Sequence, residues 1–236
     1  MAGSQDGEAE DAAVLVVFNP AAGGGRAARW RPLLRRALDD APTTVHWVES
    51  EGRGHAEALV RQWRAGVSRV VAIGGDGTVH EAVNGLLDVD SLDEPGPRGS
   101  RVALGVVHLG TGGDFRRGLG TPQGWREQLE LALTGRPVSV DVLVVELQSV
   151  EGQPIRRISA NVAGAGMNGR VVELANDSTK EWGGLATFAW ATVRAVVERP
   201  LADAVVVWRD AEGREQHWQG RLAASFFANG PYCGNG

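Results

Sequence analysis

The sequence is poor in cysteine and lysine, and it has no long apolar run. Its single cysteine, Cys233, cannot form a disulfide within the chain, so nothing requires an oxidising compartment and we expect the cytoplasm. No stretch reaches the roughly 18 uncharged apolar residues of a membrane-spanning helix. Any membrane contact is therefore expected to be peripheral, at the inner face. Lys180 is the only lysine, which excludes the lysine-containing phosphate loop of P-loop proteins.

Positive charge is also in short supply. The 24 Lys and Arg residues oppose 29 Asp and Glu residues, which gives a net charge of -5. Proteins that bind nucleic acid usually carry a strong basic surface, so we expect no nucleic-acid partner. The 43% of apolar residues and the 33 glycines are typical of a globular protein with many tight turns. Residues 1–12, acidic and small, are expected to form a disordered tail.

Strand-like and helix-like segments alternate through the first half of the chain. Apolar, β-branched runs predict the strands, and apolar residues at helical spacing predict the helices. The strands are expected at 14–18, 44–48, 69–73 and 102–107, and the helices at 27–38, 56–63 and 78–87. This alternation predicts a parallel sheet covered by helices on both faces, and so an α/β domain at residues 13–136.

From about Pro137 the pattern changes to predominantly strand-like. Strands are expected at 138–147, 155–163, 204–208 and 222–228, with one helix at 184–198. We therefore expect a second, β-rich domain at residues 137–236. The segment 185–197, which includes Phe188, Trp190, Val193, Val196 and Val197, is apolar enough to lie on a bilayer or line an acyl pocket. Packing in a protein core is the interpretation we favour for it.

A glycine-rich turn follows three of the predicted parallel strands. The turns are Asn19-Pro20-Ala21-Ala22-Gly23-Gly24-Gly25, Gly74-Gly75-Asp76-Gly77-Thr78 and Leu109-Gly110-Thr111-Gly112-Gly113-Asp114-Phe115. In parallel α/β sheets, ligands bind beyond the carboxyl ends of the strands, where glycines let backbone amides approach phosphate. Three turns at one edge predict a phosphate-binding site there.

The second turn places a carboxylate, Asp76, between glycines directly after an apolar strand. A carboxylate beside phosphates is repulsive unless it holds Mg²⁺, directly or through water, or accepts a hydroxyl proton, so Asp76 indicates a metal–nucleotide complex. The alternative is that Asp76 caps the following helix. Thr78 and Thr111 could likewise donate to phosphate oxygens or act as caps.

These motifs resemble the catalytic domain of diacylglycerol and sphingosine kinases, in their bacterial lipid kinase branch. The resemblance lies in residues 16–20, 50–56, 73–81, 109–115, 161–166 and 228–230. It implies a three-layer N-terminal α/β domain like those of phosphofructokinase and NAD kinase. A β-sandwich would follow, with the nucleotide in the cleft between the two domains. The implied activity is ATP- and Mg²⁺-dependent phosphorylation of a lipid hydroxyl, on diacylglycerol or a related lipid.

The resemblance also implies roles for individual residues. Asp76 matches the key catalytic acid, and Asp76, Asp114 and Asp141 match acids that organise Mg²⁺ through water. Contacts to ATP are implied for Asn19, Pro20, Ser50, Gly74, Gly75, Asp76, Gly77, Thr78, Val79, Gly110 and Thr111. The expected partners are the nucleotide, the lipid substrate and, at the periphery, the membrane. The oligomeric state stays open, with a homodimer among the options.

The chain departs from the family pattern in three respects. Gly113 stands where the family usually has Asn, and Ser50 where it usually has Thr. Relatives also continue well beyond the strand that contains Asn229 and Gly230. We therefore expect the chain to be the N-terminal portion of the enzyme, with an incomplete sandwich, with the general base beyond residue 236 and with little activity of its own.

Other interpretations of the sequence remain open. Gly23-x-Gly25-x-x-Ala28 formally matches the dinucleotide fingerprint, with Glu49 or Glu51 placed to meet a ribose. NAD kinase shares the Gly-Gly-Asp-Gly turn, and a non-catalytic nucleotide-binding regulator would fit as well.

Some side chains near the turns also have two interpretations. The lone histidines His46, His80 and His108 could act as bases, although structural roles are commoner. Arg116 and Arg117 could contact phosphate or form a solvated helix face.

Overall fold

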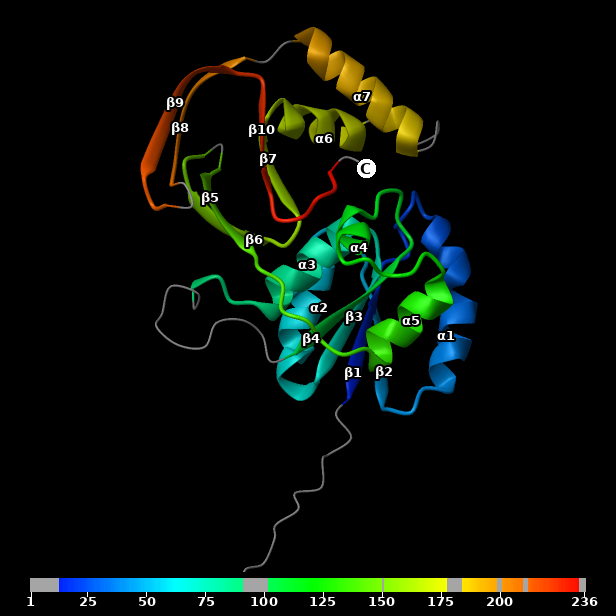
Figure 1. The fold of residues 1–236 in the computed structure, drawn as a ribbon. Helices are drawn as coiled ribbons and strands as arrows, with labels where there is room; N and C mark the ends of the chain where they lie inside the picture. Colours follow the sequence, from blue (N-terminus) through cyan, green and yellow to red (C-terminus); the bar gives the residue numbers. More distant parts are fainter. Residues whose placement is uncertain are drawn as a thin grey trace, which may run out of the picture. The chain divides into compact units, whose positions relative to one another are not determined.

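The computed structural model describes residues 13–90, 102–149, 151–177, 184–198, 201–209 and 212–233 (Figure 1). These residues form two compact units. Unit 1 holds the described residues up to Asn161 together with those from Asn229 onward, and unit 2 is Val162–Ala228. The expected tail, residues 1–12, lies outside the described residues.

Unit 1 is built on a four-stranded parallel sheet in the order β2-β1-β3-β4. The strands are β1 (Val14–Phe18), β2 (Val45–Glu49), β3 (Arg69–Gly74) and β4 (Ala103–His108). All of β1 is buried, as expected for an apolar run in a parallel strand covered on both faces. In the register, Phe18 lies beside Glu49 on one side and Ile73 on the other, so the ends of these strands are level.

Helices cover both faces of this sheet, which confirms the three-layer α/β arrangement. Alternate residues of β1 point to opposite faces. One face packs against the 3₁₀ helix η1 (Arg26–Trp30), α1 (Arg31–Asp39) and α5 (Trp125–Thr134). The other packs against α2 (His55–Trp63) and α3 (Asp76–Leu86), with the short η2 (Arg64–Gly66) after α2. The five-residue α4 (Asp114–Gly118) follows the third glycine turn.

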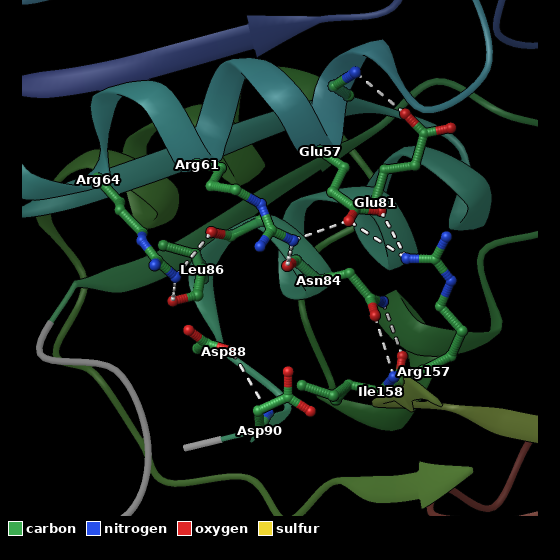
Figure 2. A network of polar contacts seen from close by, with 12 residues as sticks. Glu57, Arg61, Arg64, Glu81, Asn84, Leu86, Asp88, Asp90, Arg157 and Ile158 are labelled. Atoms are coloured by element: carbon green, nitrogen blue, oxygen red, sulfur yellow. Dashed lines mark hydrogen bonds and ion pairs between the residues drawn. The ribbon is translucent and has the colours of Figure 1, made fainter. Parts of the chain in front are cut away.

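The hairpin of β5 (Leu143–Gln148) and β6 (Pro154–Ser159) belongs to unit 1, although the sequence pattern changes earlier, near Pro137. The reason is a buried connection from α3, shown in Figure 2. The Asn84 side chain accepts a hydrogen bond from the Ile158 N–H at 3.0 Å and donates one to the Ile158 carbonyl at 2.8 Å. Ile158 also packs against Val79 and Val83 of α3.

Replacing Asn84 with alanine is expected to lower the free energy of unfolding by about 2 kcal/mol, because both backbone groups of Ile158 lose their partner in a buried place. Urea denaturation followed by circular dichroism measures this. Gln62→Ala removes an exposed amide from α2 and serves as the control. A cost for Asn84→Ala no greater than that of Gln62→Ala would contradict the assigned role.

Unit 2 is β-rich, as predicted, and it contains two antiparallel strand pairs. Its strands are β7 (Val162–Gly166), β8 (Ala202–Arg209), β9 (Glu215–Leu222) and β10 (Ala224–Ala228), and its helices are α6 (Met167–Asp177) and α7 (Gly184–Glu198). The expected strand at 155–163 is two strands, and the expected strand at 138–147 begins only at Leu143. The sequence patterns also missed α6 and the polar strand β9.

Helix α7 corrects the expectation of core packing for the segment 185–197. Its small residues Ala191 and Ala195 are fully buried, in a cluster with Val171 and Leu174 of α6. The large apolar side chains of α7 that the structure describes face outward: Trp190 is 40% exposed, Val193 64%, Val196 50% and Val197 74%. The side chain of Phe188, part of the same expectation, lies outside the described residues. Within the described residues, no helix is both long and apolar enough to cross a membrane.

Candidate functional site

The three glycine turns meet at the carboxyl edge of the sheet in unit 1. The Leu109 N–H donates to the Gly74 carbonyl at 2.7 Å, which extends the pairing of β3 and β4 into the second and third turns. A side-chain carbon on Gly110 would lie 2.6 Å from the Gly75 Cα, and one on Gly23 would lie 2.9 Å from the Leu109 carbonyl oxygen. Only glycine allows the backbones to approach this closely.

The first and second turns are joined by side chains. The side-chain amide nitrogen of Asn19 donates to the Thr78 hydroxyl oxygen at 3.0 Å. The side-chain oxygen of Asn19, Oδ1, accepts from the Ala21 N–H at 3.0 Å. Thr78 is buried. It packs on Gly74 so closely that a side-chain carbon there would lie 2.3 Å from the Thr78 hydroxyl oxygen. Gly74 thus acts by making room for Thr78, and the pair fixes the start of α3.

Asp76 joins the second turn to the third. One carboxylate oxygen accepts from the Gly113 N–H at 2.8 Å, and the other accepts from the Phe115 N–H at 3.4 Å. Asp76 is the first residue of α3, and its side chain does not cap that helix. The carboxylate instead sits at the start of α4, so the expected alternative of an own-helix cap is wrong. The position of the carboxylate is fixed by the third turn.

A second acid of α3, Glu81, holds the loop that follows β2. Its carboxylate accepts from the Gly54 N–H at 2.9 Å and from the Ala56 N–H at 3.0 Å, at the start of α2 (Figure 2). Ser50 lies at the start of this loop, is buried, and donates its N–H to the Phe18 carbonyl at 2.9 Å. Glu81 belongs to the motif at 73–81, but no role was expected for it. An acid five residues after Asp76 on the same helix was the available signal.

The three acids predicted to organise a metal do not form one cluster. Asp114 is buried and forms an ion pair with Arg117. Asp141 is exposed, and its backbone carbonyl accepts from the Asn229 side-chain amide. Among the residues that the structure describes, no three His, Cys, Asp or Glu side chains form a group that could hold a metal ion. Asp76 and Asp114 both belong to the turns, but only the Asp76 carboxylate is shown to join one turn to another.

The turns themselves fit a phosphate chain. Side-chain carbons on Gly24, Gly25 and Gly77 would meet nothing within 4 Å, so the backbone there is open to a ligand. Gly24 and Gly25 have φ angles of 70° and 85°, which favour glycine. Thr111 is exposed and Pro20 is half-buried, whereas Val79 is buried in the core beneath α3. The open glycines and the exposed Thr111 hydroxyl suit an anion, and the site fits nucleotide phosphates better than it fits a protein-held metal.

His108 supports the third turn from inside. Its ring lies against that turn, since side-chain carbons on Gly110 and Gly113 would lie 3.0 and 3.1 Å from ring atoms. The ring nitrogen Nε2 is buried without a hydrogen-bond partner. Burial lowers the pKa of His108, and the nearby Asp76 carboxylate opposes this shift only in part. A neutral, enclosed imidazole is a structural support rather than an accessible base.

His46 and the two arginines after Asp114 also have local partners, whereas His80 is exposed on α3. His46 packs on Trp63, with ring centroids 4.8 Å apart. Arg116 donates to the Thr121 and Pro122 carbonyls at 3.0 and 3.2 Å, and Arg117 pairs with Asp114. These arginines hold the segment around α4 and are not a freely solvated face.

Glu49 is engaged by other side chains and is not available to a ribose. Arg31 donates to both of its oxygens, at 2.8 Å and 2.7 Å, and Trp47 donates its indole N–H at 3.0 Å. The hydrogen bond from Arg31 lowers the pKa of Glu49, and partial burial opposes this shift. The dinucleotide fingerprint therefore lacks one of its two candidate acids.

Comparison with known proteins identifies a related family and relatives of this chain. Residues 13–145 match the family model described as the diacylglycerol kinase catalytic domain. The chain is 27% identical over 209 residues to "Probable lipid kinase YegS-like" of Enterobacter sp. (strain 638), covering 86% of this chain and 63% of that protein. It is 27% identical over 201 residues to "Probable lipid kinase YegS" of Shigella flexneri, covering 84% and 60%. The chain therefore spans less than two thirds of the length of these relatives.

A solved structure has a related fold. It comes from Bacillus anthracis str. Sterne and is named, provisionally, a diacylglycerol kinase. The sequence identity is 25%, the TM-score is 0.60, and the match covers 99% of this chain and 70% of that one. Because the family model covers more than half of the residues, these matches lead to one conclusion: the chain belongs to the diacylglycerol kinase catalytic-domain family.

Proposed function

We propose that the chain supplies the nucleotide-binding part of an enzyme that transfers a phosphoryl group from ATP to a lipid hydroxyl, on diacylglycerol or a related lipid. The observation that supports this most strongly is the meeting of the three turns around Asp76, with Asn19 bonded to Thr78 and Asp76 bonded to Gly113. Phosphoryl transfer needs positioning and charge stabilisation more than covalent chemistry by the protein. Fixed turns with open glycines supply the positioning.

The residues divide into two groups in this proposal. Gly24, Gly25 and Gly77 present open backbone, and Thr111 presents a hydroxyl, to the phosphates. Thr78, Glu81 and His108 position the turns without facing the ligand. Magnesium, if it accompanies the nucleotide, would neutralise phosphate charge, and its usual ligands are phosphate oxygens, waters and one or two carboxylates. Asp76 is the carboxylate available for that role.

Two rival functions share the glycine turns. A soluble NAD kinase-like enzyme would use the same Gly-Gly-Asp-Gly turn, and a non-catalytic regulator would bind ATP without transferring phosphate. The dinucleotide oxidoreductase is disfavoured because Glu49 is held by Arg31 and Trp47. The three remaining candidates differ in which ligands stabilise the chain and in whether a lipid gains phosphate.

Thermal unfolding with added ligands tests the nucleotide site. ATP with Mg²⁺ at about 100 times its Kd should raise the midpoint by about 5–10 °C, since binding to the folded state alone stabilises it by about 2.7 kcal/mol. NAD without ATP should leave the midpoint unchanged. A shift with NAD alone favours an oxidoreductase, shifts with each ligand favour an NAD kinase-like enzyme, and no shift with ATP refutes the proposed site.

Transfer of radiolabelled phosphate from ATP to mixed lipids tests the reaction. The assay should use the complete reading frame of the gene, because the chain spans 63% and 60% of the length of the two lipid kinases compared above. Label in the lipid fraction supports the proposal. An ATP-dependent thermal shift with no shift from NAD and no lipid labelling would favour a non-catalytic nucleotide-binding protein instead.

A further inference from the structure

Positive charge is concentrated in one short part of a chain that is acidic as a whole. Residues 13–38 contain five arginines and no Asp or Glu, whereas the full chain has a net charge of -5. The five are Arg26, Arg29, Arg31, Arg35 and Arg36. Arg31 pairs with Glu49, and the side chain of Arg26 donates to the Gly23 carbonyl at 2.8 Å. The other three arginines are exposed.

One of these exposed arginines, Arg29, and a further arginine on α5, Arg126, lie over tryptophan rings where η1 meets α5, whereas Arg35 lies over the Trp47 ring of β2. Arg29 lies over the Trp30 ring, 5.6 Å from its centroid, and Arg126 lies over the Trp125 ring at 4.5 Å. The two tryptophan rings contact each other, with centroids 5.8 Å apart. This contact places the start of α5 next to η1 in unit 1.

An exposed stripe continues from this contact along α1. Arg29, Leu33 and Arg36 follow one another at helical spacing and are exposed, and Leu33 is 44% exposed. We define the arginine–tryptophan face as Arg29, Trp30, Leu33, Arg36, Trp125 and Arg126. Within the described part of the chain, none of its arginines forms a salt bridge.

Acidic groups near this face lie on α5. Glu127 and Glu130 are exposed there. The Glu127 carboxylate turns back toward Gly124, at the N-terminus of its own helix, where the helix dipole favours it. Beside α1, Glu49 pairs with Arg31, which lies outside the face, and Asp39 is the first acidic residue after Gly25 in the sequence.

We infer that the arginine–tryptophan face docks unit 1 on an anionic phospholipid surface. Arginine near such a surface gains electrostatic energy from the lipid charge, and tryptophan with its amphipathic ring is favoured at the interface between water and acyl chains. The half-buried Trp30 and Trp125 and the exposed Leu33 supply apolar area among the charges. The inference rests on the proposed function, because a lipid acceptor has to be met at a membrane.

The position of the face suits this role. η1 begins directly after Gly25, so the face starts beside the first glycine turn, at the same edge of the sheet as the candidate nucleotide site. A membrane that contacts this face would lie next to the edge where the phosphates are proposed to bind. An acidic protein could also bind the arginines of this face. We favour a membrane because it uses the arginines, the tryptophans and Leu33 together.

Sedimentation with phospholipid vesicles tests the inference. The chain should bind vesicles of 70% phosphatidylcholine and 30% phosphatidylglycerol, and binding should weaken as salt is raised. The double substitution Arg29→Glu and Arg36→Glu should lower the partition coefficient by at least about 30-fold, since each arginine near an anionic surface contributes about a factor of five.

The control variant carries the same change of charge at another place. Arg136→Glu with Arg209→Glu replaces two exposed arginines outside the face and should lower binding less than about threefold. Equal losses in both double variants, or equal binding to pure phosphatidylcholine vesicles, would overturn the inference. The ATP-dependent thermal shift, measured on the same proteins, separates the nucleotide-site proposal from the membrane-docking proposal. If the shift is absent while vesicle binding is retained, only the nucleotide site is refuted.

Discussion

Replacing Asp76 with asparagine is expected to lower phosphoryl transfer to lipid by about 100- to 1,000-fold. The Asp76 carboxylate bridges the second and third turns, and asparagine keeps its shape while removing its charge. One amide N–H of the asparagine would then face a backbone N–H of Gly113 or Phe115. The turn would shift, and the charge that we propose for the metal–phosphate complex would be gone.

A second acid on the same helix provides the control for this experiment. Glu81 also accepts two backbone N–H groups, from Gly54 and Ala56. Asp76→Asn and Glu81→Gln should therefore lower the free energy of unfolding by similar amounts, about 1–3 kcal/mol each. Transfer should fall within about tenfold for Glu81→Gln. Equal losses of activity in both variants would show that Asp76 has only a structural role.

The N-terminal half of the fold could be predicted from sequence because it is coded locally. The run Val14–Phe18 is apolar throughout and ends at Asn19-Pro20, and the structure begins and ends β1 at those same residues. In unit 2 such coding is uneven: the helix expected at 184–198 is α7, and the strands expected at 204–208 and 222–228 overlap β8 and β10, but β9 was missed. β9 is mostly polar, and its pairing with β8 is what makes it a strand, so its sequence gave little signal.

In the candidate site, too, some features could be predicted from the local sequence, and others depend on contacts between residues far apart in the chain. That the turns after β1, β3 and β4 meet follows from the geometry of any parallel sheet. The bonds that fix them join residues far apart in sequence: Asn19 to Thr78, Asp76 to Gly113, and Glu81 to Gly54. Residue type alone marked Asp76, but it did not reveal that its carboxylate meets the start of α4. Glu81 belonged to the motif at 73–81 but received no role of its own, and Asn84 belonged to no motif. The roles of both became visible only through their partners.

The departure at residue 113 has a physical explanation in the structure. The family usually has Asn there, and this chain has glycine with a φ of 106°. A side-chain carbon at Gly113 would lie 3.1 Å from two atoms of the His108 ring, which fills that space. Gly113 and His108 therefore form a closely fitted pair, in which a side chain at residue 113 would fit only if the ring moved by a few tenths of an ångström.

Gly113→Asn is accordingly expected to lower the free energy of unfolding by about 3 kcal/mol, from backbone strain at positive φ together with overlap with the imidazole. Gly120→Asn is the matched control, because Gly120 also has positive φ, at 65°, but a side-chain carbon there meets nothing within 4 Å. It should cost about 1 kcal/mol or less. Denaturant unfolding measures both.

Adding His108→Ala to Gly113→Asn should recover about 1–2 kcal/mol relative to the sum of the two single changes, since removing the ring relieves the overlap while the backbone strain remains. The recovery is specific to the pair, because His108→Ala combined with Gly120→Asn should be additive within about 0.5 kcal/mol. Additive losses in both combinations would mean that the ring does not limit residue 113. In that case strain at positive φ alone would explain why glycine stands at this position.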